Sequence, residues 1–352
     1  MTVHDLVINW RGDVIENSHI VHAAIVDSNN NLLYSLGDHS RLTLARSAAK
    51  PFQALAILET GAAEKFGFDD ADVALISGSH NCEQKHISRV KAMLQKVGVT
   101  EQDMNCGGHP SLSKVINTGW IKSNFVPTAV YSNCSAKHVG MLAAAKALGV
   151  GIENYHLPTH PVQLKIKQVH EQLAGLKPDE LRWVIDGCNA PSPALPLQNM
   201  ALIYAKLGHA SELGEDHDDP SIIRNQRRLY HAMADHPDMI GGDSRFCTDF
   251  MRSCPGFWVG KLGAEGCYGV GIRDSQQTRD LGAEGGLGIA VKIEDGNIDI
   301  LYAALVEILT RLNLGTAEAR ERLKQSHCTL ARNTMGIETG HLSFQMGLKE
   351  HN

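Results

Sequence analysis

The order of strand and helix patterns along the chain constrains its fold more than any single motif. β-type runs occur near the N-terminus, over residues 18–36, and again from residue 256 onward, where apolar segments alternate with glycine-containing turns. The stretch between these regions is dominated by apolar residues at helical spacing. This order predicts an α+β fold, with one mostly antiparallel sheet built from both chain ends, flanked by helices, and with a helical middle region.

Local signals predict the individual elements. Residues 19–27 and 32–36 are expected to form a hairpin, because the asparagines between them tolerate left-handed turn geometry. A helix is expected over residues 47–60 with Ser47 as its cap, and VALIS (residues 73–77) is expected to be a buried strand. Further strands are predicted at 183–187, 257–263, 267–273 and 285–296, and further helices at 86–98, 134–148, 161–173, 197–207, 221–234 and, closing the chain, 299–313.

Length and composition bound the domain organisation and the class of protein. At roughly 150 residues per domain, 352 residues are compatible with one large catalytic unit over residues 1–352. We expect a sheet lobe over about residues 8–80 and 256–352, and a helical middle region over about residues 81–255. With 33 basic against 39 acidic residues and no basic run, the chain is not expected to bind nucleic acid.

The hydropathy pattern and the cysteine content favour a cytoplasmic protein without a membrane segment. No apolar stretch approaches the ~18 residues that span a bilayer, and the N-terminus lacks the pattern of a secretory leader. Eight cysteines without a CxxC pair are too few for a disulfide scaffold, so the thiols are expected to be reduced.

Ser47 and Lys50 form the first candidate catalytic motif. A serine becomes a nucleophile when a base removes its proton, and lysine serves as that base when its pKa falls from about 10.4 toward 7–8. On a helix, residues three apart share a face, so Lys50 could reach Ser47. The alternative is a capping serine followed by an ordinary lysine.

Two later strings complete a three-part pattern. Residues 79–81 read Ser-His-Asn, and residues 261–263 read Lys-Leu-Gly. The ordered set SxxK, SxN and KxG matches the sites of penicillin-binding proteins and serine β-lactamases, although the spacings differ, which favours the same chemistry on another substrate. His80 and His86 flank the serine turn, and a structural role is expected for His86.

The cysteines supply a second candidate site. Cys134 is predicted to open a helix with Lys137 on the same face, Cys188 follows a strand beside Asp186, and Cys247 is placed in a turn between helices. Thiolates are soft ligands that suit Zn²⁺. Alternatively, these are buried free cysteines that act as small apolar residues.

Five strings together resemble the rhizobial-type, zinc-containing L-asparaginase II family. The resemblance extends over about residues 8–345, and it is carried by RSAAKPFQ (46–53), SGSHNCEQKH (77–86), NCSAKHVGML (133–142), IDGCNAPSPALPL (185–197) and KLGAEGCYGVGI (261–272). It implies a fold similar to that of serine β-lactamases and glutaminases, and a homodimer.

The resemblance also implies roles for individual residues. It implies two Ser–Lys tandems, Ser47 with Lys50 and Ser79 with Lys261. It implies one zinc ion per subunit, held by Cys134, Lys137, Cys188 and a water molecule. Residues expected to bind substrate or lie near the site are Arg46, His80, Asn81, Asp186 and Cys247.

The chain departs from the family at four positions. Family members often carry glycine where this chain has Cys82, Ala136 and Asn189, and histidine where it has Ser132. Because Cys82 and Asn189 add side chains beside the expected pocket, they could change the fit of the substrate or the discrimination between asparagine and glutamine.

The mechanism expected from this resemblance is hydrolysis of L-asparagine to L-aspartate and ammonia, as in asparagine catabolism, through an acyl-enzyme. Lys50 deprotonates Ser47, which attacks the side-chain amide, while Ser79 and Lys261 relay a proton to the leaving ammonia; Ser79 is the second choice for the nucleophile. Zinc is expected to support substrate binding rather than supply the nucleophile. The alternatives are hydrolysis of another small amide, such as glutamine or a β-lactam, and a non-catalytic zinc-dependent amino-acid binder.

Overall fold

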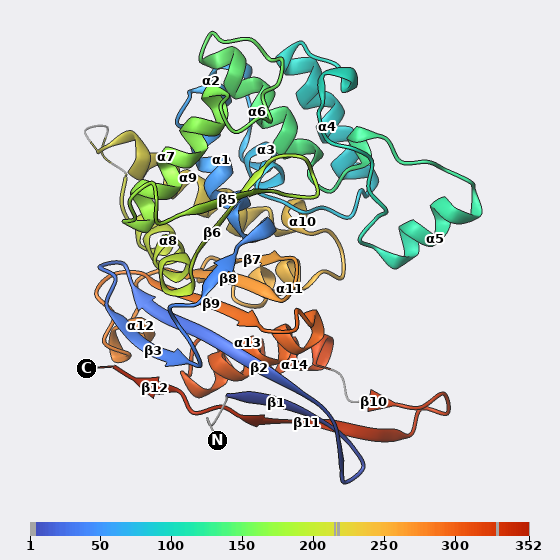
Figure 1. Cartoon of the computed structure of the whole chain (residues 1–352), viewed down its shortest axis with the longest axis vertical. Coiled ribbons are helices and arrows are strands. Elements are labelled where there is room, and N and C mark those ends of the chain that lie inside the picture. Colours follow the sequence, from blue (N-terminus) through green and yellow to red (C-terminus); the bar gives the residue numbers. More distant parts are fainter. Residues whose placement is uncertain (1–4, 215, 217–218, 329–330, 352) are drawn as a thin grey trace. The chain divides into compact units, whose positions relative to one another are not determined.

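The computed structural model describes residues 5–214, 216, 219–328 and 331–351 (Figure 1). The chain divides into two compact units. Unit 1 comprises residues 1–48, 195–209 and 249–352, and unit 2 comprises residues 49–194 and 210–248. The sequence analysis expected the boundaries between the sheet lobe and the helical region near residues 80 and 255.

Unit 1 is organised around an antiparallel sheet drawn from both chain ends, as the sequence predicts. The strand order is β10-β11-β1-β2-β9-β8-β7, and β3 pairs with β2 and β12. β2 is shared, because its residues 14–20 pair with β1 and its residues 21–27 pair with β9. The strands are β1 (Leu6–Arg11), β2 (Val14–Asp27), β3 (Leu32–Leu36), β7 (Trp258–Gly263), β8 (Cys267–Ile272), β9 (Leu287–Ile293), β10 (Ala331–Arg332), β11 (Glu338–Gln345) and β12 (Lys349–Glu350), and β4 (Leu42–Leu44) also lies in this unit.

Glycines allow helix α8 (Leu197–Ala210) to approach the sheet of unit 1 closely. A Cβ atom on Gly269 of β8 would lie 2.0 Å from the Tyr204 ring, and one on Gly288 of β9 would lie 1.9 Å from the Ala201 carbonyl oxygen. Helix α13 (Ile298–Arg311) also packs on β8 and β9. The short helix α12 (Gln276–Asp280) lies between β8 and β9 in the chain.

The chain does not close with α13, so this part of the prediction is wrong. Helix α14 (Ala317–His327) and strands β10, β11 and β12 follow it. β11 contains few β-branched residues, and its strand conformation is stabilised by pairing with β1 from the opposite end of the chain.

Unit 2 is mainly helical, and α6 (Ser135–Ala147) packs against five other helices of the unit: α1, α2, α3, α4 and α7. Small residues in α6 permit this, and a Cβ atom on Gly140 would lie only 3.0 Å from the Ile57 side chain. The other elements are α1 (Lys50–Leu58), α2 (Ala62–Phe66), α3 (Asp70–Ile76), α4 (Gln84–Val97), α5 (Lys114–Lys122), α7 (Pro161–Ala174), α9 (Ser221–Asp235), α10 (Pro237–Ile240), the start of α11 (Phe246–Ser253) and the strand pair β5 (Arg182–Ile185) and β6 (Pro191–Pro196). Among the described helices, none is both long enough and apolar enough to cross a bilayer.

Two local predictions near the serine motifs are wrong. VALIS belongs to helix α3 and its end, not to a strand, because Asp69 and Asp72 form a capping box at the start of α3. The helix is buried on most sides, so its apolar run lacks the period that would identify it. Ser47 does not cap α1, because it lies in a 3-10 turn (Arg46–Ala49) and α1 begins at Lys50.

Candidate active site

Ser79 lies in the turn between α3 and α4, and the backbone of residues 240–241 holds this turn in place. The Ser79 N–H donates to the Ile240 carbonyl oxygen at 2.8 Å, and the Asn81 N–H donates to the Gly241 carbonyl oxygen at 3.0 Å. A Cβ atom on Gly78 would lie 2.6 Å from the Met239 carbonyl oxygen, so the contact requires glycine at this position. The serine is therefore presented on a rigid turn.

Lys50 contacts Ser79 directly. The Nζ atom of Lys50 lies 2.9 Å from Ser79 Oγ, 2.6 Å from the Gly78 carbonyl oxygen and 3.3 Å from the Asn133 carbonyl oxygen, and the lysine is 2% exposed. Nζ donates to all three oxygens, and its distance to Ser79 Oγ is within the range over which a proton can pass between two side chains. This arrangement can perform proton abstraction from Ser79.

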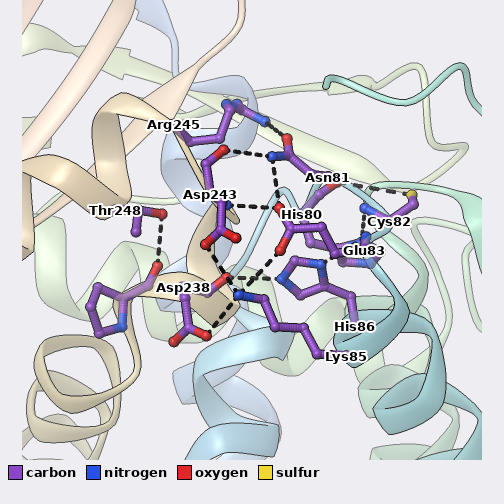
Figure 2. A network of polar contacts seen from close by, with 11 residues as sticks. His80, Asn81, Cys82, Glu83, Lys85, His86, Asp238, Asp243, Arg245 and Thr248 are labelled. Atoms are coloured by element: carbon purple, nitrogen blue, oxygen red, sulfur yellow. Dashed lines mark hydrogen bonds and ion pairs between the residues drawn. The ribbon is translucent and has the colours of Figure 1, made fainter. Parts of the chain in front are cut away.

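A polar network surrounds the turn (Figure 2). Asn81 Nδ2 donates to Glu83 Oε1 at 3.1 Å and to the Asp243 carbonyl oxygen at 3.1 Å, and the Asp243 N–H donates to Glu83 Oε1 at 2.7 Å. Lys85 forms ion pairs with Glu83, Asp238 and Asp243. Burial acts to raise the pKa of Glu83, but the hydrogen bonds from Asp243, Asn81 and Lys85 outweigh it and lower that pKa. Glu83 thus stays ionised as the centre of the network.

Arg245 connects this network to Ser79. Its Nη1 atom lies 2.9 Å from Asn81 Oδ1 and 3.3 Å from the Ser79 carbonyl oxygen. Figure 2 shows its guanidinium group directed at the Asn81 side chain. No local sequence signal identified Arg245, because it lies far along the chain from the SHN string.

His80 and His86 are buried and stacked, with ring centroids 5.1 Å apart. His80 Nδ1 accepts the Cys82 N–H at 3.2 Å, which assigns the proton to Nε2 and makes it the donor to Ser135 Oγ at 3.0 Å. Burial, together with the charges of His86, Lys50 and Arg245, lowers the pKa of His80 well below its ordinary value. His86 binds the Glu83 N–H and the Asp238 carbonyl oxygen, which are the contacts of a structural residue.

The other two motif residues lie in unit 1. Ser47 is half-buried in the 3-10 turn, directly after Arg46, which has a left-handed backbone (φ 49°). Lys261 is 1% exposed on β7 and donates to the Leu262 carbonyl oxygen at 2.7 Å. A Cβ atom on Gly263 would lie 2.3 Å from the Ala45 carbonyl oxygen and 3.3 Å from Ala48. The glycine of the KxG string therefore lets β7 approach the segment that carries Ser47.

The cysteine site forms at the start of α6. Cys134 is the N-cap residue of α6, Lys137 lies in its first turn, and Cys188 occupies the turn after β5. Lys137 Nζ lies 3.1 Å from Cys188 Sγ. The hydrogen bond from Cys134 lowers the pKa of Cys188 far below its ordinary value, while the same bond raises that of Cys134. Burial opposes the charge of Lys137, but the neighbouring sulfurs outweigh it and raise the pKa of Lys137.

The match to known proteins covers nearly the whole chain, because the family model for L-asparaginase II matches residues 7–344. The chain belongs to the L-asparaginase II family. It is accordingly an asparaginase-type amidohydrolase that acts on a small molecule. A search of the curated proteins finds no match.

The donor chemistry of the cysteine site suits the predicted zinc ion. Two sulfurs and an amine nitrogen meet there, and the Asp186 charge also acts on Lys137. In the described part of the chain, no group of three or more His, Cys, Asp or Glu side chains is arranged to hold a metal. The predicted set therefore depends on Lys137, which would bind a metal only after losing its proton.

Three further features of the candidate site differ from or add to the sequence analysis. Cys247 is buried in the first turn of α11, so its expected place in a turn between helices is wrong. Cys82 and Asn189, two of the positions at which the resemblance leads us to expect glycine in the family, both have left-handed backbones, with φ of 61° and 66°. Asn133 supplies a carbonyl oxygen to Lys50, a role that the NCSAKH string did not reveal.

Proposed function

We propose that the protein is a cytoplasmic L-asparaginase that hydrolyses L-asparagine to L-aspartate and ammonia on a serine β-lactamase-like fold. The observation that carries this proposal is the contact of 2.9 Å between Lys50 Nζ and Ser79 Oγ inside a buried, rigid turn. The membership of the L-asparaginase II family supports the substrate.

The reaction proceeds through an acyl-enzyme. A lysine amine removes the proton of a serine hydroxyl, and the serine oxygen attacks the side-chain amide carbon. The Ser79–Lys261 pair relays a proton to the amide nitrogen as the C–N bond breaks, so that the nitrogen leaves as ammonia. Water then attacks the ester, and L-aspartate leaves. Backbone N–H groups at the site stabilise the oxyanion, and loss of one such donor typically costs about 10²–10³ in rate.

Two serines compete for the role of nucleophile. The SxxK pattern favours Ser47 with Lys50, whereas the direct contact of Lys50 supports Ser79 as the serine that this lysine activates. Lys261 is proposed as the second lysine, with Ser79 as its partner. Both tandems belong to the proposal, and mass spectrometry of a trapped ester distinguishes the two serines.

Cys134, Lys137 and Cys188 would hold a zinc ion, with Asp186 and Cys247 nearby. When bound, zinc acts as a Lewis acid and a fixed positive charge. The protein residues at this site would orient the amino-acid end of the substrate, so the site is expected to affect KM more than kcat.

The test is ammonia release from L-asparagine and L-glutamine by the wild type, Ser47→Ala and Ser79→Ala. We expect release from asparagine by the wild type and loss of at least about 10³-fold in both variants. Mass spectrometry of a trapped ester then identifies the acylated serine. An exposed serine outside the site, Ser40→Ala, is the control and should leave the rate unchanged.

Other results would redirect the proposal. Release from glutamine alone would indicate another small amide as the substrate. Tight asparagine binding in calorimetry without any turnover would indicate an amino-acid binder. Size-exclusion chromatography with light scattering tests the proposed homodimer.

A further inference from the structure

Arg245 differs from two other half-buried arginines of unit 2, Arg89 and Arg228, in its partners. Arg89 forms ion pairs with Asp69 and Asp72, and Arg228 forms ion pairs with Glu64 and Asp70. Among the described residues, Arg245 has no carboxylate partner and donates only to neutral oxygens. It is therefore a cation without an anion, held within hydrogen-bond distance of the Ser79 backbone.

The donors of Arg245 are only partly used. Nη1 makes both of its hydrogen bonds, to the Ser79 carbonyl oxygen and to Asn81 Oδ1. Its Nε and Nη2 atoms make no hydrogen bond with the residues that the structure describes. A half-buried guanidinium group with unused N–H donors is suited to a carboxylate, which it binds through parallel N–H···O bonds.

The surrounding network separates the Glu83 carboxylate from Arg245. The Asn81 side chain lies between the two charges, since its Oδ1 accepts from Arg245 while its Nδ2 donates to Glu83. The Glu83 carboxylate forms an ion pair with Lys85 and accepts a hydrogen bond from the Asp243 N–H. The arrangement therefore fixes the position of Arg245 without neutralising it.

We propose that Arg245 binds the α-carboxylate of the amino-acid substrate, which makes it a specificity-determining residue. This inference rests on the proposed function, because L-asparagine carries a carboxylate only a few bonds from the amide that the serine attacks. Arg245 holds the substrate by one end, and Ser79, whose carbonyl it contacts, lies beside the other end. Small amides without a carboxylate are then poor substrates.

The experiment compares L-asparagine with β-alaninamide, which is asparagine without its α-carboxylate. Loss of a hydrogen-bonded charge pair typically lowers binding about 30- to 100-fold, so Arg245→Gln should raise the KM for asparagine by that factor. Its kcat/KM for β-alaninamide should stay within about threefold of wild type. The KM of Arg245→Lys for asparagine should lie between those of the wild type and Arg245→Gln, because lysine keeps the charge but lacks the planar guanidinium group.

Lys85→Gln is the matched control, because it weakens the same network without touching Ser79 or Asn81. Lys85→Gln should lower kcat/KM only slightly, and by the same factor for asparagine and β-alaninamide. If Arg245→Gln lowers kcat/KM equally for both substrates, Arg245 merely supports the turn and the proposal is overturned. The proposal also fails if Arg46→Gln, rather than Arg245→Gln, removes the preference for asparagine.

Calorimetry separates this proposal from the proposed function. L-Aspartate and β-alanine are titrated into the wild type and Arg245→Gln, a measurement that needs no turnover. Weaker binding of aspartate alone in the variant supports the carboxylate site even if the wild type releases no ammonia. Failure of the wild type to bind aspartate, or equal binding by both proteins, overturns it.

Discussion

Two buried lysines of unit 2 have opposite surroundings. Lys50 is the first residue of α1 and Lys137 lies in the first turn of α6, and they are 2% and 3% exposed. Among the residues that the structure describes, Lys50 Nζ forms hydrogen bonds with oxygen atoms alone, two carbonyls and the Ser79 hydroxyl. Lys137 contacts the sulfur of Cys188.

The two surroundings favour different roles for the lysines. The partners of Lys50 are uncharged, and one of them is the hydroxyl group whose proton it is proposed to remove. The hydrogen bond from Cys134 lowers the pKa of Cys188, and the neighbouring sulfurs raise the pKa of Lys137. We therefore expect the loss of Lys50 and the loss of Lys137 to have different effects.

The largest expected effect comes from removing each lysine in turn. Lys50→Met should lower kcat for asparagine by about 10³-fold or more, because a general base contributes about 10²–10⁴. Lys137→Met should lower kcat much less and raise KM instead. Steady-state ammonia release measures both, and equal losses of kcat in the two variants would contradict the comparison.

Metal removal tests the cysteine site next. If zinc binds Cys134, Lys137 and Cys188, dialysis against a chelator should raise KM by about tenfold or more while kcat changes less. Elemental analysis should find one zinc per chain in the wild type and a loss in Cys188→Ser. A chelated enzyme with no kcat and an unchanged KM would assign the metal to the chemical step.

Acid pH should destabilise the turn that Lys50 contacts. His80 is neutral in the folded protein because its pKa lies well below the ordinary value of 6.5. The unfolded chain therefore binds more protons once the pH falls below about 6.5, and each further unit costs up to about 1.4 kcal/mol of unfolding free energy until the lowered pKa is reached. Above pH 6.5 this contribution is fully present.

Urea unfolding between pH 8 and pH 5 measures this effect. The unfolding free energy of the wild type should fall toward pH 5, and His80→Asn should fall less steeply. His170 provides a second buried histidine for comparison, because burial lowers its pKa to about 4. His170→Phe should reduce the slope by a similar amount, whereas an unchanged slope in His80→Asn would show that His80 is not the group concerned.

The smallest effects are expected at Cys82, Asn189 and Ala136, the three positions at which the resemblance leads us to expect glycine in the family. Cys82 and Asn189 have left-handed backbones, so glycine should be more stable than alanine by about 1 kcal/mol at each position. Ala136 lies within α6, so Ala136→Gly should instead cost about 1 kcal/mol. Thermal unfolding measures the stability of all these variants. If Cys82→Gly is less stable than Cys82→Ala, the argument from the left-handed backbone is contradicted.

The sequence by itself determined most of the elements. Periodicity and turn residues located the hairpin over residues 19–36, α4, α6 and α7, because these elements have a clear period or a glycine at their end. It did not identify α3, whose apolar run is buried on most sides, or β11, which depends on a partner strand from the other chain end. The candidate residues were also chosen from motifs alone.

Only the tertiary structure decided which of these residues meet. Ser47 lies three positions before Lys50, yet the described contact of Lys50 is with Ser79, 29 positions away. Arg245 is 166 positions from Ser79, and no local pattern links them. Hydrogen bonds act over about 3 Å in space whatever the separation along the chain, so the sequence specified the chemical groups and the packing of unit 2 specified their partners.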